Sequence, residues 1–112
     1  MDLTIESRGG VHVIRLYGEL DASAADKMLP QLRLLASTET PKVVVDLDGI
    51  RLMNSVGLGT LIAGSQTLAK AGGALALARP QAAVRRVLAL ARIQGLAKIY
   101  DDLESALAAL GS

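Results

Sequence analysis

The chain contains no cysteine, tryptophan or phenylalanine, and its 112 residues include a single histidine, His12. Without cysteine it has neither disulfides nor thiolate metal sites, and a lone histidine excludes a histidine-cluster metal centre. The only aromatic residues are two tyrosines, which leave almost nothing on which nucleic-acid bases could stack. We therefore predict no metal, no other cofactor and no single-stranded nucleic-acid partner.

Excess charge of one sign and long apolar runs are also missing. Twelve basic and eleven acidic residues give a net charge of +1, so nothing favours a polyanionic partner. The first residues, MDLTIESRGG, lack the apolar run of a signal peptide, and no stretch reaches the ~18 apolar residues of a membrane span. Apolar residues nevertheless make up 51% of the chain, which is enough to fill one core. We expect a single cytoplasmic domain over residues 1–112, without a membrane partner.

The N-terminal half predicts a hairpin, a helix and a central strand. Segments 2–7 and 11–17 alternate polar and apolar residues around a glycine turn, as paired antiparallel strands do. Asp21 or Ser23 can cap the helix that follows. The run VVVDL at 43–47 is apolar on both faces, which is typical of a strand covered on two sides.

The C-terminal half alternates helices with short strands. A helix ends at the Gly-Gly pair of residues 72–73, and ALALA at 74–78 is a short buried strand. Pro80 suits the first position of a third helix whose end lies just before Gly95, and Asp101 and Glu104 have capping-box spacing before a last helix. The fold class is therefore a single α/β domain: a mixed, mostly parallel sheet with an N-terminal hairpin and about four helices.

The segment MNSVGLG at 53–59 joins the central strand to the next helix, where sites form in open α/β sheets. In the simplest interpretation Asn54 or Ser55 only caps the helix. A dinucleotide-binding fingerprint would need a third glycine at Ile62, and a phosphate-binding loop would need Gly-Lys-Ser/Thr where the chain has Gly-Thr-Leu. Neither of these nucleotide-binding motifs is present.

A serine hydrolase is disfavoured as well. The nucleophile elbow would need glycine two residues before Ser55, where the chain has Met53. The only available base, His12, lies on the predicted hairpin as an ordinary strand residue. We predict that the protein is not an enzyme and has no catalytic residue.

Ser55 is better suited to being modified. A helix N-terminus carries free N–H groups and the positive end of the helix dipole, so it tolerates an added anion. A phosphoserine would bring about −1.5 to −2 charges at neutral pH. That charge would arise on a surface otherwise made of backbone and the apolar side chains of Met53, Val56 and Leu58, which suits a switchable contact surface.

Four features, taken in order, resemble the STAS domain and specifically the bacterial anti-sigma factor antagonists. They are G-E-L-D at 18–21, VVVDL at 43–47, MNSVGLG, which is close to the family's M-D-S-S-G-L-G, and the C-terminal pattern R-P...V...L...G-L...I-Y-D-D-L-E-S-A-L. The resemblance implies a regulator of transcription that binds a GHKL-type anti-sigma factor kinase while its serine is unphosphorylated, so that a sigma factor is released. The kinase then phosphorylates the serine with ATP, and a protein phosphatase reverses the mark.

Carried over by position, the phosphoacceptor is Ser55, and Asp21 is a second partner contact, with a helix cap as the alternative role. The rest of the implied partner-binding segment is Met53, Asn54, Val56, Gly57 and Leu58. Asn54 stands where the family has aspartate, and Val56 stands where it has a second serine. The first difference removes a negative charge from the segment that is implied to bind the partner. Gly57 and Gly59 are expected to provide backbone shape and access.

Two other interpretations stay open at this point. One is a STAS scaffold subunit of a stress-signalling or transporter-associated complex, in which Ser55 is unmodified. The other is a module that binds a small ligand or nucleotide at its helix N-termini. The remaining basic side chains, among them Arg79 and Arg85, are expected to be solvated.

Overall fold

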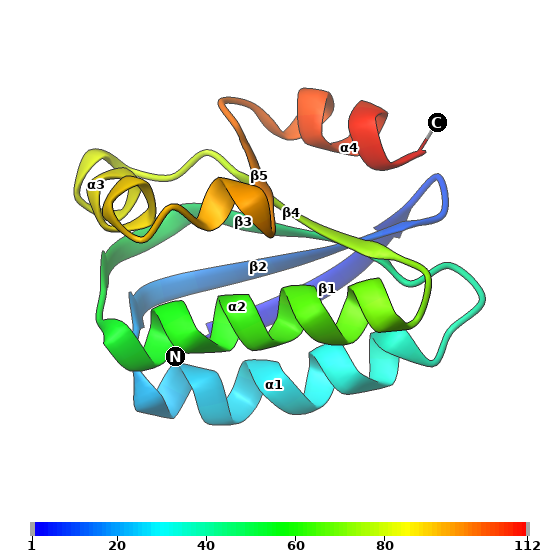
Figure 1. Cartoon of the computed structure of the whole chain (residues 1–112), viewed down its shortest axis with the longest axis horizontal. Helices are drawn as coiled ribbons and strands as arrows, with labels where there is room; N and C mark the ends of the chain where they lie inside the picture. The colour runs from blue at the N-terminus through cyan, green and yellow to red at the C-terminus, as the bar shows by residue number, and fades with distance from the viewer. Residues whose placement is uncertain (1, 112) are drawn as a thin grey trace.

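The structure is a computed structural model and describes residues 2–111 (Figure 1). Over that range one five-stranded sheet is combined with four α-helices and a short 3-10 helix, η1. The elements are β1 (Asp2–Arg8), β2 (Val11–Leu20), α1 (Ala22–Ala36), β3 (Lys42–Met53), α2 (Ser55–Lys70), β4 (Ala74–Ala78), α3 (Ala82–Leu90), η1 (Ile93–Gly95), β5 (Lys98–Tyr100) and α4 (Leu103–Gly111). The predicted element order and fold class are confirmed.

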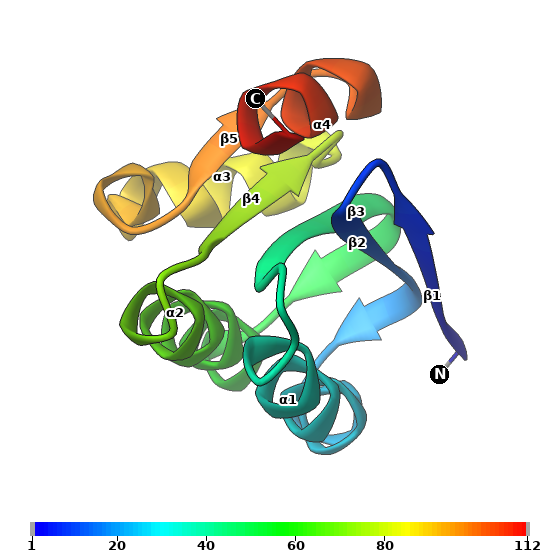
Figure 2. The ribbon, with the colours of Figure 1, turned by 90° about the vertical axis from the view of Figure 1, so that its right-hand side faces the viewer.

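The sheet has the strand order β1-β2-β3-β4-β5. β1 and β2 are antiparallel across the two-glycine turn, whereas β2, β3, β4 and β5 pair in parallel. Right-handed crossovers between strands added in sequence always return over the same face, so α1, α2 and α3 share one face of the sheet. α4 follows the last strand and covers the other face (Figure 2).

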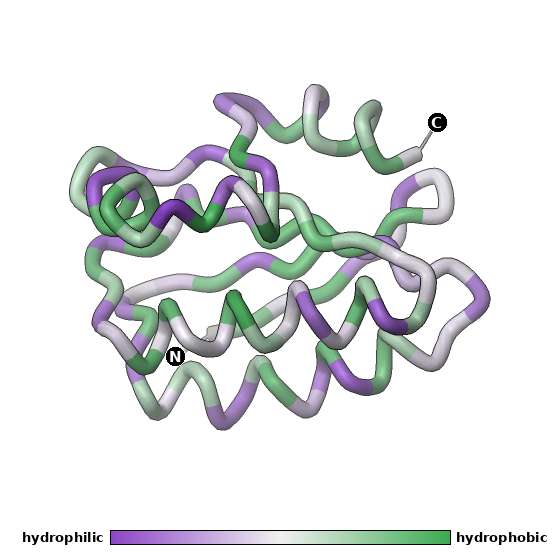
Figure 3. Tube along the Cα trace, viewed as in Figure 1, coloured by the Kyte–Doolittle hydropathy of each residue, from purple (hydrophilic) through white to green (hydrophobic). Residues whose placement is uncertain are grey.

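The core has two parts because the sheet is covered on both faces. In the larger part Val43 and Val45 pack with residues of α1, α2 and α3, while Val44 joins a smaller cluster with Ala106 of α4. Figure 3 shows apolar residues recurring between polar ones along α1 and α2, as expected for helices with one buried face. The apolar run predicted to be a central strand therefore lies where both of its faces are buried.

Local signals placed the end of α2 correctly. Gly72 adopts a φ of 84°, and its amide donates to the carbonyl of Ala69, while the Gly73 amide donates to that of Leu68. This is the Schellman arrangement, which needs a left-handed residue after the helix and therefore favours glycine.

Three predicted boundaries are wrong. α3 begins at Ala82, after Gln81, so Pro80 precedes the helix rather than opening it. The same helix ends at Leu90, well before Gly95. α4 is capped by Asp102, whose carboxylate accepts from the Ser105 amide at 2.7 Å, and not by Asp101. No helix within residues 2–111 has the length and hydropathy required to cross a bilayer.

Candidate functional site

The candidate site lies where β2 and β3 end side by side. Both strands run further than predicted, and their last paired residues are Leu20 and Met53. The Asn54 amide donates to the Leu20 carbonyl at 3.2 Å, which ties the two strand ends together. Parallel strands end at the same edge of a sheet, so the helices that follow them begin next to each other.

Each of these helices begins with a capping side chain. Asp21 Oδ1 accepts from the Ala24 amide at 3.1 Å at the start of α1, and Asn54 Oδ1 accepts from the Gly57 amide at 3.0 Å at the start of α2. The capping alternative is therefore correct for Asp21 and Asn54. Their positions also bring Asp21 to the same edge of the sheet as the MNSVGLG segment.

Ser55 is the first residue of α2 and is exposed to solvent. Asn54 already occupies the cap position, and within residues 2–111 nothing hydrogen-bonds to the Ser55 hydroxyl. The first turn of α2 contains no acidic residue, so the positive end of its dipole is not neutralised there. The hydroxyl is accessible and lies where an added anion would be stabilised.

Gly57 is buried against the end of β2. A Cβ atom at this position would lie 2.1 Å from the Leu20 carbonyl oxygen, far inside van der Waals contact. Gly59, two residues further along α2, has no atom within 4 Å of such a Cβ. Close approach therefore requires glycine at position 57, whereas the expectation that Gly59 is needed for backbone shape is wrong.

The exposed surface around Ser55 is partly apolar. Val56 is 48% exposed, and Leu52, near the end of β3, is 54% exposed. Met53 is buried in the main core and Leu58 packs against it, so these two side chains face inward. Leu52 was missed because the predicted strand ended before it, and the extension of β3 to Met53 carried no clear sequence signal.

The sequence alone also did not predict an ion cluster around the buried Asp46, on the face of the sheet that α4 covers. Asp46 in β3 is 2% exposed, and its carboxylate accepts from Arg79 Nη2 at 2.5 Å and from Arg15 Nε at 3.3 Å. Its Oδ1 also accepts from the Asp48 amide at 3.1 Å. Arg79, predicted to be solvated, thus binds a buried carboxylate 33 residues away.

The charged side chains around Asp46 form ion pairs with one another. Burial alone would raise the pKa of Asp46, but hydrogen bonds from Arg79, the Asp48 amide and Arg15, with the positive charge of Arg79, hold that pKa below its ordinary value. Arg15 also pairs with Glu6, and Arg79 with Asp48. With its charges paired internally, the cluster joins β2, β3 and the residue after β4 rather than offering a free charge to a ligand.

The site thus belongs to a small α/β domain with an exposed serine at a helix N-terminus, and residues 2–111 contain no cluster of metal-ligating side chains. The chain belongs to the STAS domain family, which it matches over residues 2–106.

The chain is similar to several anti-sigma factor antagonists. It is 27% identical over 111 residues to the anti-sigma F factor antagonist of Paenibacillus polymyxa, covering 98% of this chain and 95% of that protein. The crystal structure of an anti-sigma factor antagonist from Mycobacterium paratuberculosis matches with a TM-score of 0.88 at 27% identity, over 99% of this chain and 94% of the other. The Bacillus cell fate determinant SpoIIAA in its phosphorylated form shares the fold, with a TM-score of 0.76 at 20% identity, over 96% and 98% of the two chains.

Proposed function

We propose that this protein is an anti-sigma factor antagonist whose activity is switched by phosphorylation of Ser55. The unphosphorylated form binds a GHKL-type anti-sigma factor kinase, and the sigma factor held by that kinase is released. The protein itself catalyses no reaction. The phosphoryl group passes from ATP to Ser55 Oγ in the active site of the kinase, and a phosphatase later removes it by hydrolysis.

One observation carries this proposal: the Ser55 hydroxyl is exposed and has no partner within the described range of the chain, although it lies at a helix N-terminus where serines commonly cap. Asn54 performs the capping, so Ser55 can be modified without loss of a structural hydrogen bond. The similarity to anti-sigma factor antagonists adds support, since one of them, SpoIIAA, has been solved in an unphosphorylated and in a phosphorylated form.

The partner would contact the apolar side chains of Leu52 and Val56, with Asp21 at the neighbouring helix start. A phosphate on Ser55 would be stable in the free protein because it faces the N-terminus of α2. In a closed interface the same phosphate would lose its hydration without gaining a partner, and burial of an unpaired charge is strongly unfavourable. Every 1.4 kcal/mol of that penalty weakens binding tenfold.

Binding measurements on Ser55 variants test this mechanism. Calorimetric titration of the purified kinase should give similar affinity for wild type and Ser55→Ala, and affinity weaker by at least about tenfold for Ser55→Asp. Ser105→Asp is the matched control, because it adds the same charge to the first turn of α4 on the other face of the sheet. Equal affinity for Ser55→Asp and wild type, or equal losses at positions 55 and 105, would contradict a switch at Ser55.

A further inference from the structure

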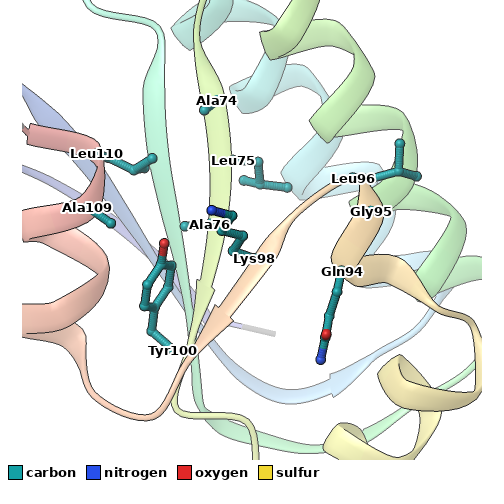
Figure 4. A pocket seen from close by; sticks show the side chains of 10 residues that line it. All are labelled: Ala74, Leu75, Ala76, Gln94, Gly95, Leu96, Lys98, Tyr100, Ala109 and Leu110. Carbon is teal, nitrogen blue, oxygen red and sulfur yellow. The ribbon is translucent and has the colours of Figure 1, made fainter.

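A groove runs along the edge of the sheet that is furthest from β1. β5 is only three residues long and pairs with Ala76, Leu77 and Ala78, so within residues 2–111 the first two residues of β4 have no strand beside them on that side. The space left open is a cavity of about 310 Å³ between the last turn of α4 and η1. Figure 4 shows β4 as its floor, with Leu110 on one side and Leu96 on the other.

The groove exists because strand β5 is short and several of the residues that line the space are small. Ala74 and Ala76 form the floor, Ala109 contributes to the α4 wall, and Gly95 to the η1 wall. Larger side chains at these positions would fill the space. The remaining apolar surface comes mainly from Leu96 and Leu110, because Leu75 lines the groove but is buried in the main core; a ligand in the groove would bury this hydrocarbon.

Two polar side chains of β5 reach into this apolar space. Lys98 and Tyr100 are two residues apart on the strand and therefore point to the same face. Figure 4 shows Lys98 lying over β4 beside Ala76, and the Tyr100 ring standing next to Ala109 and Leu110. Over the described part of the chain, neither the Lys98 ammonium nor the Tyr100 hydroxyl has an ion pair or a hydrogen bond.

The nearby carboxylates do not neutralise Lys98. Asp101 pairs with Arg85 at 2.8 Å, and Asp102 caps α4 through the Ser105 amide. Neither lines the groove, and among residues 2–111 Lys98 is its only charged lining residue. The groove thus combines an apolar floor with one cation, the Tyr100 hydroxyl and the amide of Gln94 on the η1 side.

We propose that this groove binds a small anionic amphiphile, specifically an unbranched alkyl carboxylate. The alkyl chain lies over the start of β4, between Leu96 and Leu110, and the carboxylate accepts hydrogen bonds from Lys98 Nζ and Tyr100 Oη. The cavity volume is at the low end of the roughly 300–1,000 Å³ typical of ligand pockets, which suits a chain of about six to eight carbons. A nucleoside triphosphate does not fit this description, because the groove offers a single cation and a mainly apolar lining.

The groove and the Ser55 site lie at opposite ends of the sheet. β3 and β4 are parallel, with Lys42 opposite Ala74 at their beginnings, whereas Ser55 lies two residues beyond the end of β3. A carboxylate in the groove therefore leaves the proposed kinase-binding surface open, and this inference does not depend on the proposed function.

The test is a titration of the ¹⁵N-labelled protein with hexanoate, with 1-hexanol as the neutral probe of matched length. We expect saturable shifts of the Leu75, Lys98 and Leu110 amides with hexanoate, and weaker binding of 1-hexanol. Lys98→Gln should weaken hexanoate roughly fivefold without changing 1-hexanol, as expected for loss of an exposed ion pair. Lys70→Gln, at the exposed end of α2, should change neither.

A second variant blocks the space itself. Ala109→Phe adds bulk to an exposed position of the α4 wall, so the fold should be retained, while binding of both probes should be lost. Absence of saturable shifts up to about 20 mM hexanoate would overturn the proposal, since even a weak specific site has a Kd in the millimolar range. Equal affinity for both probes, or no effect of Lys98→Gln, would also overturn it.

Discussion

Replacement of Gly57 by alanine should destabilise the protein, because the added methyl group has no room. Its Cβ would lie 2.1 Å from the Leu20 carbonyl oxygen and 2.8 Å from the Leu20 Cγ. Ordinary contact begins near ~3.5 Å, so the start of α2 would have to move away from β2 by more than ~1 Å. That movement would stretch the 3.2 Å hydrogen bond between the Asn54 amide and the Leu20 carbonyl.

The expected cost for Gly57→Ala is about 2–3 kcal/mol, the upper range for overpacking a site that cannot relax freely. A loss of that size lowers the Tm of a domain of this length by roughly 10–15 °C. Because Ser55 moves with the start of α2, affinity for the kinase should also fall.

Gly59→Ala is the matched control, because it makes the same chemical change two residues further along α2. A Cβ at Gly59 meets no atom within 4 Å, and alanine is the better helix former. This variant should therefore be more stable than wild type by about 0.5–1 kcal/mol. Urea unfolding followed by circular dichroism measures both variants, and equal stabilities would refute the close-packing argument.

Three further variants probe the ion cluster and the two helix caps. Folding lowers the pKa of Asp46, so the ionised carboxylate stabilises the fold above the ordinary carboxyl pKa, and this stabilisation is lost as pH falls through the lowered value. Asp46→Asn should therefore cost about 3 kcal/mol of unfolding free energy at pH 7 and much less at pH 2. Urea unfolding at both pH values measures the two costs. An equal loss at both pH values would show that shape, not charge, matters there. Asp21→Ala should cost about 1 kcal/mol as a lost cap and also weaken kinase binding in calorimetry below the melting transition; unchanged affinity would leave only the capping role. Asn54→Asp should keep the cap and the Tm but change kinase affinity or phosphorylation rate, and equal values for both would remove position 54 as a determinant.

Most of the fold followed from local patterns in the sequence. The alternation in the hairpin, the two-sided apolar run of β3 and the Gly72-Gly73 stop signal each depend on residues close together in the chain. Helix starts were less predictable, since several adjacent residues can cap. α3 begins after Gln81, whose side chain makes no capping hydrogen bond, so no residue type marked its first turn.

The parts that could not be predicted depend on long-range geometry. Arg79 binds Asp46 across 33 residues, and nothing in its local sequence distinguishes it from a solvated arginine. Likewise, the tight contact that requires glycine at position 57 of α2, but not at position 59, is made with Leu20 at the end of β2, far away in the sequence. The proximity of Asp21 to Ser55 could be predicted, because parallel strands bring their carboxyl ends to one edge of the sheet.

The most direct test of the proposed switch is to map the phosphate. Wild type and Ser55→Ala are incubated with the anti-sigma factor kinase and ATP, and the products are digested and analysed by mass spectrometry. The proposed switch predicts one phosphate on Ser55 in wild type and none in Ser55→Ala. A phosphate on Ser23, Thr60 or Ser65 instead, or an unmodified wild-type chain after prolonged incubation with an active kinase, would contradict it.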